Sequence, residues 1–427
     1  MPTMNEANSR FAARAAWSVL LGLSLLATFA TVAKAQEEAG PSLSLGAAYT
    51  GDWRRNTTGG LRTGDEYSDA VDLGVTWVAD GLFANARMTT SLSVMYLGGG
   101  DVTGARVGDL QGINNLEAGN GWKLYESWVE FTFGESSNTL RAGVLDLNAE
   151  FDTPVTQGIF TASPFGIGTE FSQTGARGPV CWPTTGLGLR AAGDVGSSLH
   201  WRFGAYDGAP GTDDDDFMST RVSSDDGALF VGELEYSGRR VHKLALGAWS
   251  YTADFERIDA PLAPSSADED GNQGFYTHFD TRLGSLGSVD IDGALRAGVA
   301  DARFNAVKRY VGVAFTATHL VPARPGDTLG LGVARARLGD PYRAFRFFDG
   351  QPATATETTF ELVYRAELTP WLAVLPVVQF VRDPGADPFM DDSWIAGLRF
   401  ELTRDHSWQL SAKRETPPDG SYARTNE

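Results

Sequence analysis

The side chains that most often carry catalysis or hold metals are sparse in this sequence. The chain has five histidines and one cysteine, Cys181. None of the histidines belongs to a G-x-S-x-G nucleophile turn or an H-E-x-x-H zinc motif; they are His200, His242, His278, His319 and His406. A single cysteine excludes an internal disulfide framework and a zinc cluster built from several cysteines. We therefore expect no enzymatic activity, no metal and no cofactor.

Charged and aromatic side chains recur instead at alternate positions of short segments. Glu126, Trp128 and Glu130 share one face of residues 122–133 if that segment is extended. The polar faces of other such segments carry arginines, namely Arg141, Arg190, Arg202, Arg282, Arg296 and Arg365. A guanidinium group is a planar, multidentate donor that suits vicinal hydroxyls, and an aromatic ring offers a flat face to C–H groups. The same arginines could instead pair with carboxylates and stiffen a wall, so both roles stay open.

The segments that carry these residues alternate polar and apolar side chains with a period of two. In residues 356–367, Phe360 and Leu362 fall on one face, whereas Glu361 and Arg365 fall on the other. This period predicts strands with one apolar and one wet face. We expect sixteen strands, near residues 42–53, 66–78, 83–97, 122–133, 138–149, 184–192, 198–207, 226–237, 240–253, 270–284, 287–300, 308–318, 327–338, 356–367, 370–382 and 392–403.

The connections between these strands mostly alternate between long and short. The long ones lie near residues 54–65, 98–121, 150–183, 208–225, 254–269 and 339–355, and the short ones include 79–82, 134–137, 238–239, 285–286 and 368–370. Outer-membrane barrels have long extracellular loops and short periplasmic turns, which gives this rhythm. The sequence therefore predicts an all-β fold: a sixteen-stranded antiparallel up-and-down transmembrane β-barrel with short periplasmic turns and long extracellular loops.

The N-terminus has the layout of an export signal. Arg10 and Arg14 precede an apolar run from Ala15 to Ala30, and Ala33-Lys34-Ala35 fits a cleavage site. The apolar run has about 16 residues, fewer than the roughly 20 of a membrane helix. The expected organisation is a cleaved signal peptide at residues 1–35, a barrel at 36–410 and a C-terminal tail at 411–427.

Composition agrees with a barrel in a bacterial outer membrane. Only every second residue of a barrel strand faces lipid, so a hydrophobic content of 42% is compatible with membrane insertion. The formal net charge of −19 argues against nucleic acid as a partner. We expect an integral outer-membrane protein whose partners are outer-membrane lipids and small polar solutes.

Three stretches carry a family resemblance. The first is Gly108–Glu117, which runs on to Leu124–Glu130. The second extends from Arg141 through Phe151, Phe165 and Trp182 to Arg190, and the third is Pro384–Pro388 followed by Trp394–Arg399. In order and spacing, the chain resembles the OprB family of carbohydrate-selective porins across nearly all of its mature part. It departs from such barrels in continuing beyond Phe400 to Glu427 instead of stopping near a terminal aromatic residue.

The resemblance implies a sixteen-stranded barrel that lets monosaccharides such as glucose diffuse across the membrane. Two other functions remain open: a general porin for small hydrophilic solutes without sugar selectivity, and a plugged structural or adhesive barrel. Both a homotrimer and a monomer are compatible with the sequence.

The longest predicted connection, residues 150–183, is too apolar for a solvated surface loop. Charged residues lie among its aromatic ones, and the residues of interest are Phe151, Asp152, Phe165, Glu170, Arg177 and Trp182. On the strand count it is the third extracellular loop, which in sixteen-stranded porins commonly folds into the lumen and narrows it. We expect this position, with an outer cap packed on neighbouring loops as the alternative.

Overall fold

The computed structural model describes residues 41–410 except 84–85, 135–136, 212–216, 219–225 and 263–270. The predicted signal peptide (1–35) and C-terminal tail (411–427) lie outside the described residues. No helix in the described part of the chain has the length and apolar character of a membrane span.

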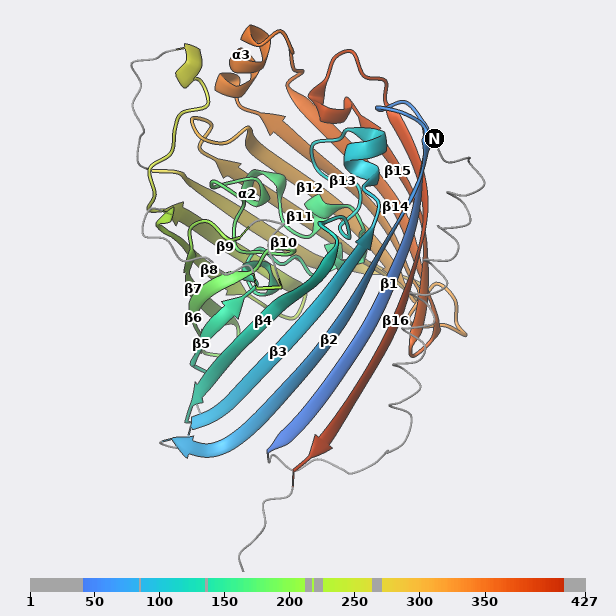
Figure 1. Ribbon diagram of the computed structural model, residues 1–427. Helices are drawn as coiled ribbons and strands as arrows, with labels where there is room; N and C mark the ends of the chain where they lie inside the picture. The colour runs from blue at the N-terminus through green and yellow to red at the C-terminus, as the bar shows by residue number, and fades with distance from the viewer. Residues whose placement is uncertain are drawn as a thin grey trace, which may run out of the picture.

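Sixteen antiparallel strands form one closed barrel, in which each strand pairs with its neighbours in sequence and the last pairs with the first (Figure 1). This confirms the predicted fold class. The strands are β1 (Ser42–Thr58), β2 (Gly64–Phe83), β3 (Ala86–Gly99), β4 (Gly121–Phe133), β5 (Thr139–Leu145), β6 (Gly186–Val195), β7 (Leu199–Asp207), β8 (Ala228–Tyr236), β9 (Val241–Tyr251), β10 (Gln273–Leu286), β11 (Val289–Ala300), β12 (Val307–Thr318), β13 (Thr328–Leu338), β14 (Thr356–Thr369), β15 (Leu372–Arg382) and β16 (Ser393–Gln409).

The barrel closes along the full length of its first and last strands. Ser42 pairs with Gln409 and Thr58 pairs with Trp394, so the chain beyond Phe400 continues β16. Both predicted strands stopped short, because polar side chains interrupt the apolar alternation there while the hydrogen-bonded ladder continues. Since Ser42 and Gln409 face each other, the two described ends of the barrel lie together at its periplasmic end.

The connections sort to the two ends as predicted, with local differences in length. The first loop shrinks from the predicted 54–65 to residues 59–63, because β1 and β2 are long. The periplasmic connection from β12 to β13 spans residues 319–327 and is longer than a tight turn. Loop 2 (residues 100–120) and loop 3 (residues 146–185) are the two long connections that matter for the site.

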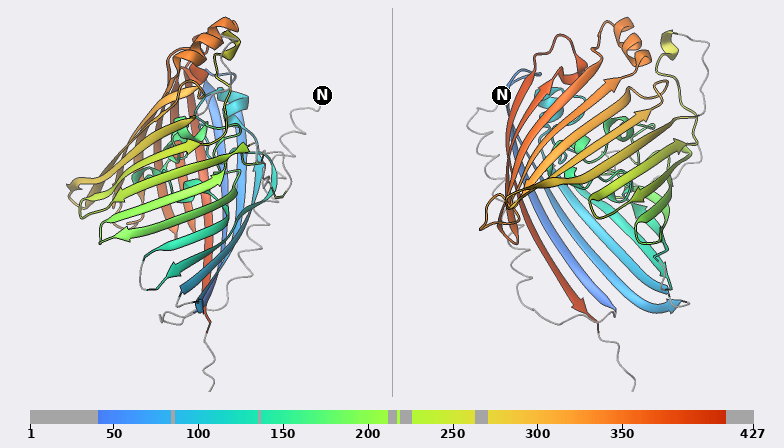
Figure 2. Two further views of the ribbon diagram at one scale, coloured as in Figure 1. Left: turned by 90° about the vertical axis from the view of Figure 1, so that its left-hand side faces the viewer. Right: turned by 180° about the vertical axis from the view of Figure 1, so that it is seen from behind.

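Short helical turns occupy the loops. Loop 3 begins earlier than predicted, because Asp146 accepts a hydrogen bond from the backbone N–H of Asn148 (2.8 Å) and starts a 3₁₀ turn. Figures 1 and 2 show α3 at the extracellular end of the barrel and α2 within the ring of strands. The helical elements are η1 (Thr103–Val107), η2 (Leu147–Ala149), η3 (Thr156–Ile159), η4 (Ser163–Phe165), α2 (Thr169–Ser172), η6 (Ala260–Leu262), α3 (Asp340–Phe348) and η7 (Pro384–Ala386).

The two faces of the barrel wall differ in polarity. Large apolar side chains point outward and stay exposed in the isolated chain, among them Leu92, Phe203, Leu246, Phe275, Leu283, Phe315, Leu331 and Leu362. The inward positions carry buried polar residues, such as Glu233, His278, Asp280 and Glu361. An apolar outside and a polar inside are what a membrane barrel requires.

The strand β13 is apolar on its outer face except at its extracellular end. Arg335 and Arg337 keep the outward register of Leu331, and the ladder with β14 has no bulge between Thr328 and Arg337. The two arginines therefore lie where β13 leaves the apolar band, at the extracellular rim.

Candidate functional site

Loop 3 lies inside the barrel and packs against the wall from β7 to β15 (Figure 1). Phe160 and Phe165 stack on each other, with ring centroids 4.5 Å apart, against Leu375 and Val377 of β15. This contact explains why the inner face of residues 370–382 is apolar: it faces the aromatic side chains of the loop instead of water.

Hydrogen bonds from the wall fix the backbone of loop 3. The carboxylate of Glu361 accepts from the backbone N–H groups of Thr161 (2.7 Å) and Ala162 (2.9 Å). Asp280 accepts from the backbone N–H of Thr156 at 2.7 Å. Buried carboxylates that receive such bonds are strong anchors, because leaving either partner unpaired would cost its desolvation.

A buried ionic cluster holds the middle of the loop to β10 and β11. Arg296 donates to Asp152 (3.0 and 2.6 Å) and Glu170 (2.5 Å), and Asp152 also contacts His278 Nε2 at 2.5 Å. Burial would raise the pKa of Asp152, but Arg296 and His278 outweigh it and lower that pKa to about 2. For Glu170, burial prevails and raises the pKa.

This cluster changes the role predicted for Arg296. Its side chain points to the lumen but is only 1% exposed, because loop 3 covers it. Arg296 therefore tethers the loop and is not accessible to a solute in this arrangement.

Of the other residues singled out in loop 3, Phe151 and Phe165 are buried, whereas Arg177 and Trp182 are partly buried. Phe151 and Phe171 are fully covered, and Phe171 stacks on Trp249 of β9 at 5.1 Å. Trp182 packs against Met95 and Leu97 on the inner face of β3. Arg177 donates to the carbonyl of Ala209 at 2.8 Å. The predicted residues of loop 3 thus bind the loop to the wall or, for Arg177, to the connection after β7, and other residues border the open space.

That open space adjoins a group of charged residues on β4, β5 and β6. Glu130, Arg141 and Arg190 lie directly opposite one another on these adjacent strands. Glu130 contacts Arg141 at 3.0 Å and Arg190 at 2.5 Å. From loop 3, Glu150 reaches the same two arginines, at 2.8 Å from Arg141 and 2.6 Å from Arg190. The adjoining open space has a volume of about 650 Å³ and is lined by Glu130, Thr139, Arg141, Ala149, Glu150, Thr153, Arg190, Ala192 and Arg202.

An aromatic ring supports this charged group. The guanidinium carbon of Arg141 lies 3.9 Å from the ring centroid of Trp128, a cation–π contact. Glu126, on the same face of β4, accepts from the backbone N–H of Asp146 at 3.0 Å and so positions the start of loop 3. Arg202 continues the group onto β7, where it pairs with Glu233 (2.9 Å) and Glu235 (2.8 Å). Donors and acceptors therefore meet beside one open space, and Arg141 covers the Trp128 ring.

Comparison with known proteins places this site in a family. A family model described as "Carbohydrate-selective porin, OprB family" matches residues 77–403.

The chain belongs to the OprB family. It is therefore an integral channel protein of the bacterial outer membrane, a carbohydrate-selective porin. A curated relative, Porin B of Pseudomonas aeruginosa, is 22% identical over 404 residues, which cover 83% of this chain and 86% of the relative.

Solved structures agree in fold. The high-pH structure of Pseudomonas putida OprB has a TM-score of 0.74 at 20% identity, covering 86% of this chain and 94% of that one. The outer-membrane channel DcaP of Acinetobacter baumannii has a TM-score of 0.55 at 10% identity, covering 87% and 100% respectively.

Two further predicted arginines of this OprB-family porin lie nearer its periplasmic end. Arg282 contacts Asp292 at 2.5 Å and Asp290 at 2.9 Å beside the turn between β10 and β11. Arg365 contacts Glu401 at 3.3 Å. Both are more than a third exposed, at 37% and 34%, so they remain within reach of a solute in the lower lumen.

The residues that anchor loop 2 were not predicted from the sequence. Asp52 and Arg399 pair at 2.6 Å, and Arg399 also donates to Asn114 (3.0 Å) and Asn115 (2.7 Å) of loop 2. Arg54 is fully buried beside Asp52. The alternation of Asp52 and Arg54 in β1 is the signal that could have marked them as inward-facing. The resemblance stretch Gly108–Glu117 is therefore a second in-folded segment of the porin.

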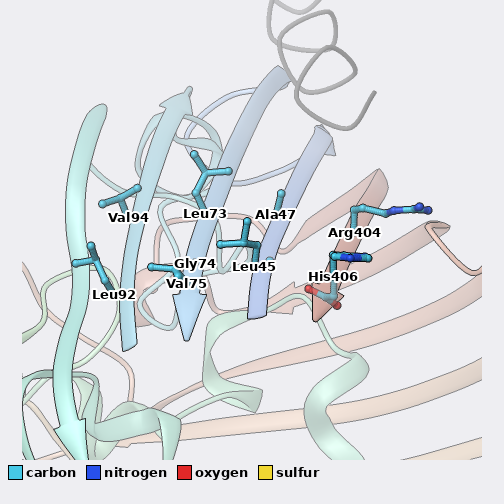
Figure 3. A pocket seen from close by; sticks show the side chains of 11 residues that line it. Leu45, Ala47, Leu73, Gly74, Val75, Leu92, Val94, Arg404 and His406 are labelled. Atoms are coloured by element: carbon cyan, nitrogen blue, oxygen red, sulfur yellow. The ribbon is translucent and has the colours of Figure 1, made fainter. Parts of the chain in front are cut away.

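An apolar hollow on the outside of this porin is not part of the solute passage. It lies over β16, β1, β2 and β3, among outward side chains such as Leu45, Leu73 and Leu92, with Arg404 and His406 at its edge (Figure 3). These side chains point away from the lumen, so the hollow belongs to the lipid-facing surface.

Proposed function

We propose that this porin lets small carbohydrates of the size of glucose diffuse passively past the open space between loop 3 and strands β4 to β7. The observation that carries this proposal is the unfilled space bordered by Arg141, Arg190, Arg202 and Glu130, with the Trp128 ring beneath Arg141. The proposal assigns no catalytic step to the chain.

The proposed passage depends on exchange of hydrogen bonds. A sugar that enters loses water, and the guanidinium and carboxylate groups replace the lost hydrogen bonds to its hydroxyls. Because Glu130 and Glu150 already hold Arg141 and Arg190 in place, little side-chain entropy is lost when a sugar arrives. The contacts must stay weak, since a tightly held solute would block conduction.

The proposal includes a second contact point farther along. Arg282 and Arg365 lie toward the periplasmic end and carry partly exposed guanidinium groups. A solute released from the charged group on β4, β5 and β6 would next meet the guanidinium donors of Arg282 and Arg365. Successive weak sites speed transport because each one limits how long the solute stays.

Liposome swelling tests the selectivity. We expect proteoliposomes to swell several-fold faster in glucose than in a zwitterionic amino acid or an organic acid of similar mass. Paired Arg and Glu groups offer hydrogen bonds to hydroxyls without a net field that favours one ion. Rates that follow solute size alone would show a general porin, and no swelling in any solute would show a plugged barrel. Liposomes without protein control for leakage.

A further inference from the structure

A group of outward arginines marks the extracellular rim of one side of the barrel. Arg309 lies on β12, Arg335 and Arg337 on β13, and Arg382 on β15, and all of them are exposed. We refer to these four as the rim arginines. They stand out in a chain whose formal net charge is −19.

The strand register places the rim arginines close together. Arg309 pairs directly with Arg337 across β12 and β13. Arg335 pairs with Thr358 of β14, which pairs with Arg382 on its other side. The four side chains therefore occupy two adjacent rows of one outer surface.

An aromatic row lies one outward position below Arg335 and Arg382, and two positions below Arg309 and Arg337. Phe360, Phe380 and Trp394 are neighbours across β14, β15 and β16, with ring centroids 5.9 and 4.8 Å apart. Aromatic belts of this kind sit at the level of lipid headgroups. The rim arginines lie on the extracellular side of this row, Arg382 on β15 and the others on the adjoining β12 and β13, and are thus at the height of headgroup phosphates.

Little of this charge is paired directly within the protein. Asp340 contacts Lys308 at 2.9 Å, and its pKa is lowered mainly by Lys308 and to a smaller extent by Arg337. Among the described residues, no carboxylate lies within 4 Å of a guanidinium nitrogen of Arg309, Arg335 or Arg337, whereas Arg382 has Asp383 at 3.8 Å. At the same end of β1, by contrast, Arg55 is paired with Asp65 at 3.1 Å. Like charges directly opposite each other on a sheet repel, so the Arg309–Arg337 pair calls for an external anion.

We propose that the rim arginines bind the phosphate groups of a lipopolysaccharide molecule in the outer leaflet. Guanidinium groups bind phosphate bidentately, and two adjacent rows of them suit a headgroup with more than one phosphate. The acyl chains would lie along the apolar surface below, against Phe360 and Leu331. This inference uses only the outer-membrane location of the porin and is independent of the solute that it conducts.

Native mass spectrometry of the purified full-length porin tests the proposal. The wild type is titrated with bisphosphorylated lipid A, dephosphorylated lipid A and phosphatidylglycerol, with and without inorganic phosphate. The test variant is R309Q/R335Q/R337Q. The control is R404Q, which removes an exposed outward arginine at the periplasmic end (Figure 3). The variant R309K/R335K/R337K keeps the charge, and heat-modifiable gel mobility verifies that each barrel is folded.

We expect the glutamine variant to bind bisphosphorylated lipid A at least roughly tenfold more weakly than the wild type, since hydrogen bonds to charged groups are lost. The control should bind as the wild type does, and the lysine variant should fall between them. Equal binding by the folded glutamine variant, or an equal loss in R404Q, would overturn the proposal. Equal binding of dephosphorylated lipid A would show that acyl chains alone are recognised. Equal binding of phosphatidylglycerol, or full competition by millimolar phosphate, would show a general anion surface.

Discussion

Replacing Arg296 with methionine is expected to release loop 3 and raise the single-channel conductance. The substitution keeps most of the side-chain volume but leaves Glu170 buried without its cation and Asp152 with His278 as its remaining partner in the cluster. Removing one partner of a buried ion pair costs about 3–5 kcal/mol. Because Arg296 is 1% exposed, solvent screening reduces this figure little. The cost falls on the segment around Asp152, so we expect this segment to leave the wall.

Planar bilayer recordings measure this effect. The matched control is R87M, since Arg87 also lies on an inner face but pairs with Asp80 in an exposed salt bridge at 2.8 Å, which contributes about 0–1 kcal/mol. R87M should conduct as the wild type does. An R296M channel with unchanged conductance and unchanged solute discrimination would show that the other anchors, such as Glu361, hold loop 3 without the ionic cluster.

The pH dependence of the tether follows from Asp152. Its pKa is lowered to about 2, below the ordinary value of about 3.9. A carboxylate with a lowered pKa stabilises the folded state above its unfolded pKa and loses that contribution as the pH falls toward its folded pKa. The contribution of Asp152 is therefore complete above about pH 5 and declines between about pH 4 and 2.

Replacing Arg141 with glutamine is expected to weaken the proposed sugar contact roughly tenfold, because hydrogen bonds to a charged group are worth about 1.5–3 kcal/mol. Arg141 is suited to touch solute since its side chain is 17% exposed, whereas that of Arg190 is 4% exposed. The Trp128 ring below it is left without its cation. Current noise as a function of glucose concentration gives the apparent dissociation constant.

The matched variant for this experiment is R141K. Lysine keeps the positive charge over Trp128 but lacks the planar set of donors. Ion selectivity should therefore stay near that of the wild type in R141K, while the sugar contact weakens by less than in R141Q. If the wild type, R141Q and R141K all have the same apparent dissociation constant for glucose, Arg141 does not contact the sugar.

The strands could be predicted from the sequence because their side chains alternate between an apolar lipid face and a polar lumen face. In β14, Phe360 and Leu362 face lipid while Glu361 and Arg365 face the lumen, and only Val363, which packs with the aromatic residues of loop 3, interrupts this pattern between them. The residues at which the strands end were harder to predict. In β1 the ladder continues through Arg54 and Asn56, whose polar side chains look like loop residues until their buried partners are known.

The lumen residues could be assigned to a face but not to a role. Arg141 and Arg296 both alternate with apolar neighbours, yet one borders open space and the other is buried under loop 3. The difference comes from Asp152, which is distant in sequence and reaches Arg296 only in the folded chain. The alternation of residue types along a single strand carries no information on such contacts.

The inner face of β15 shows the same limit. Leu375 and Val377 break the expected polar pattern, and their meaning becomes visible only with Phe160 and Phe165 packed against them. An apolar stretch on a lumen face thus marks where an in-folded loop docks. This rule could be applied to other barrels from sequence alone.

The central claim is that this chain forms an open channel in which sugars compete with ions for one constricted passage. Single-channel recording of the wild-type protein with increasing glucose tests it most directly. We expect steady conducting steps whose size falls with glucose concentration in a saturable manner and falls less with an amino acid of similar mass. A channel without conducting steps, or conducting steps that no sugar alters, would contradict it.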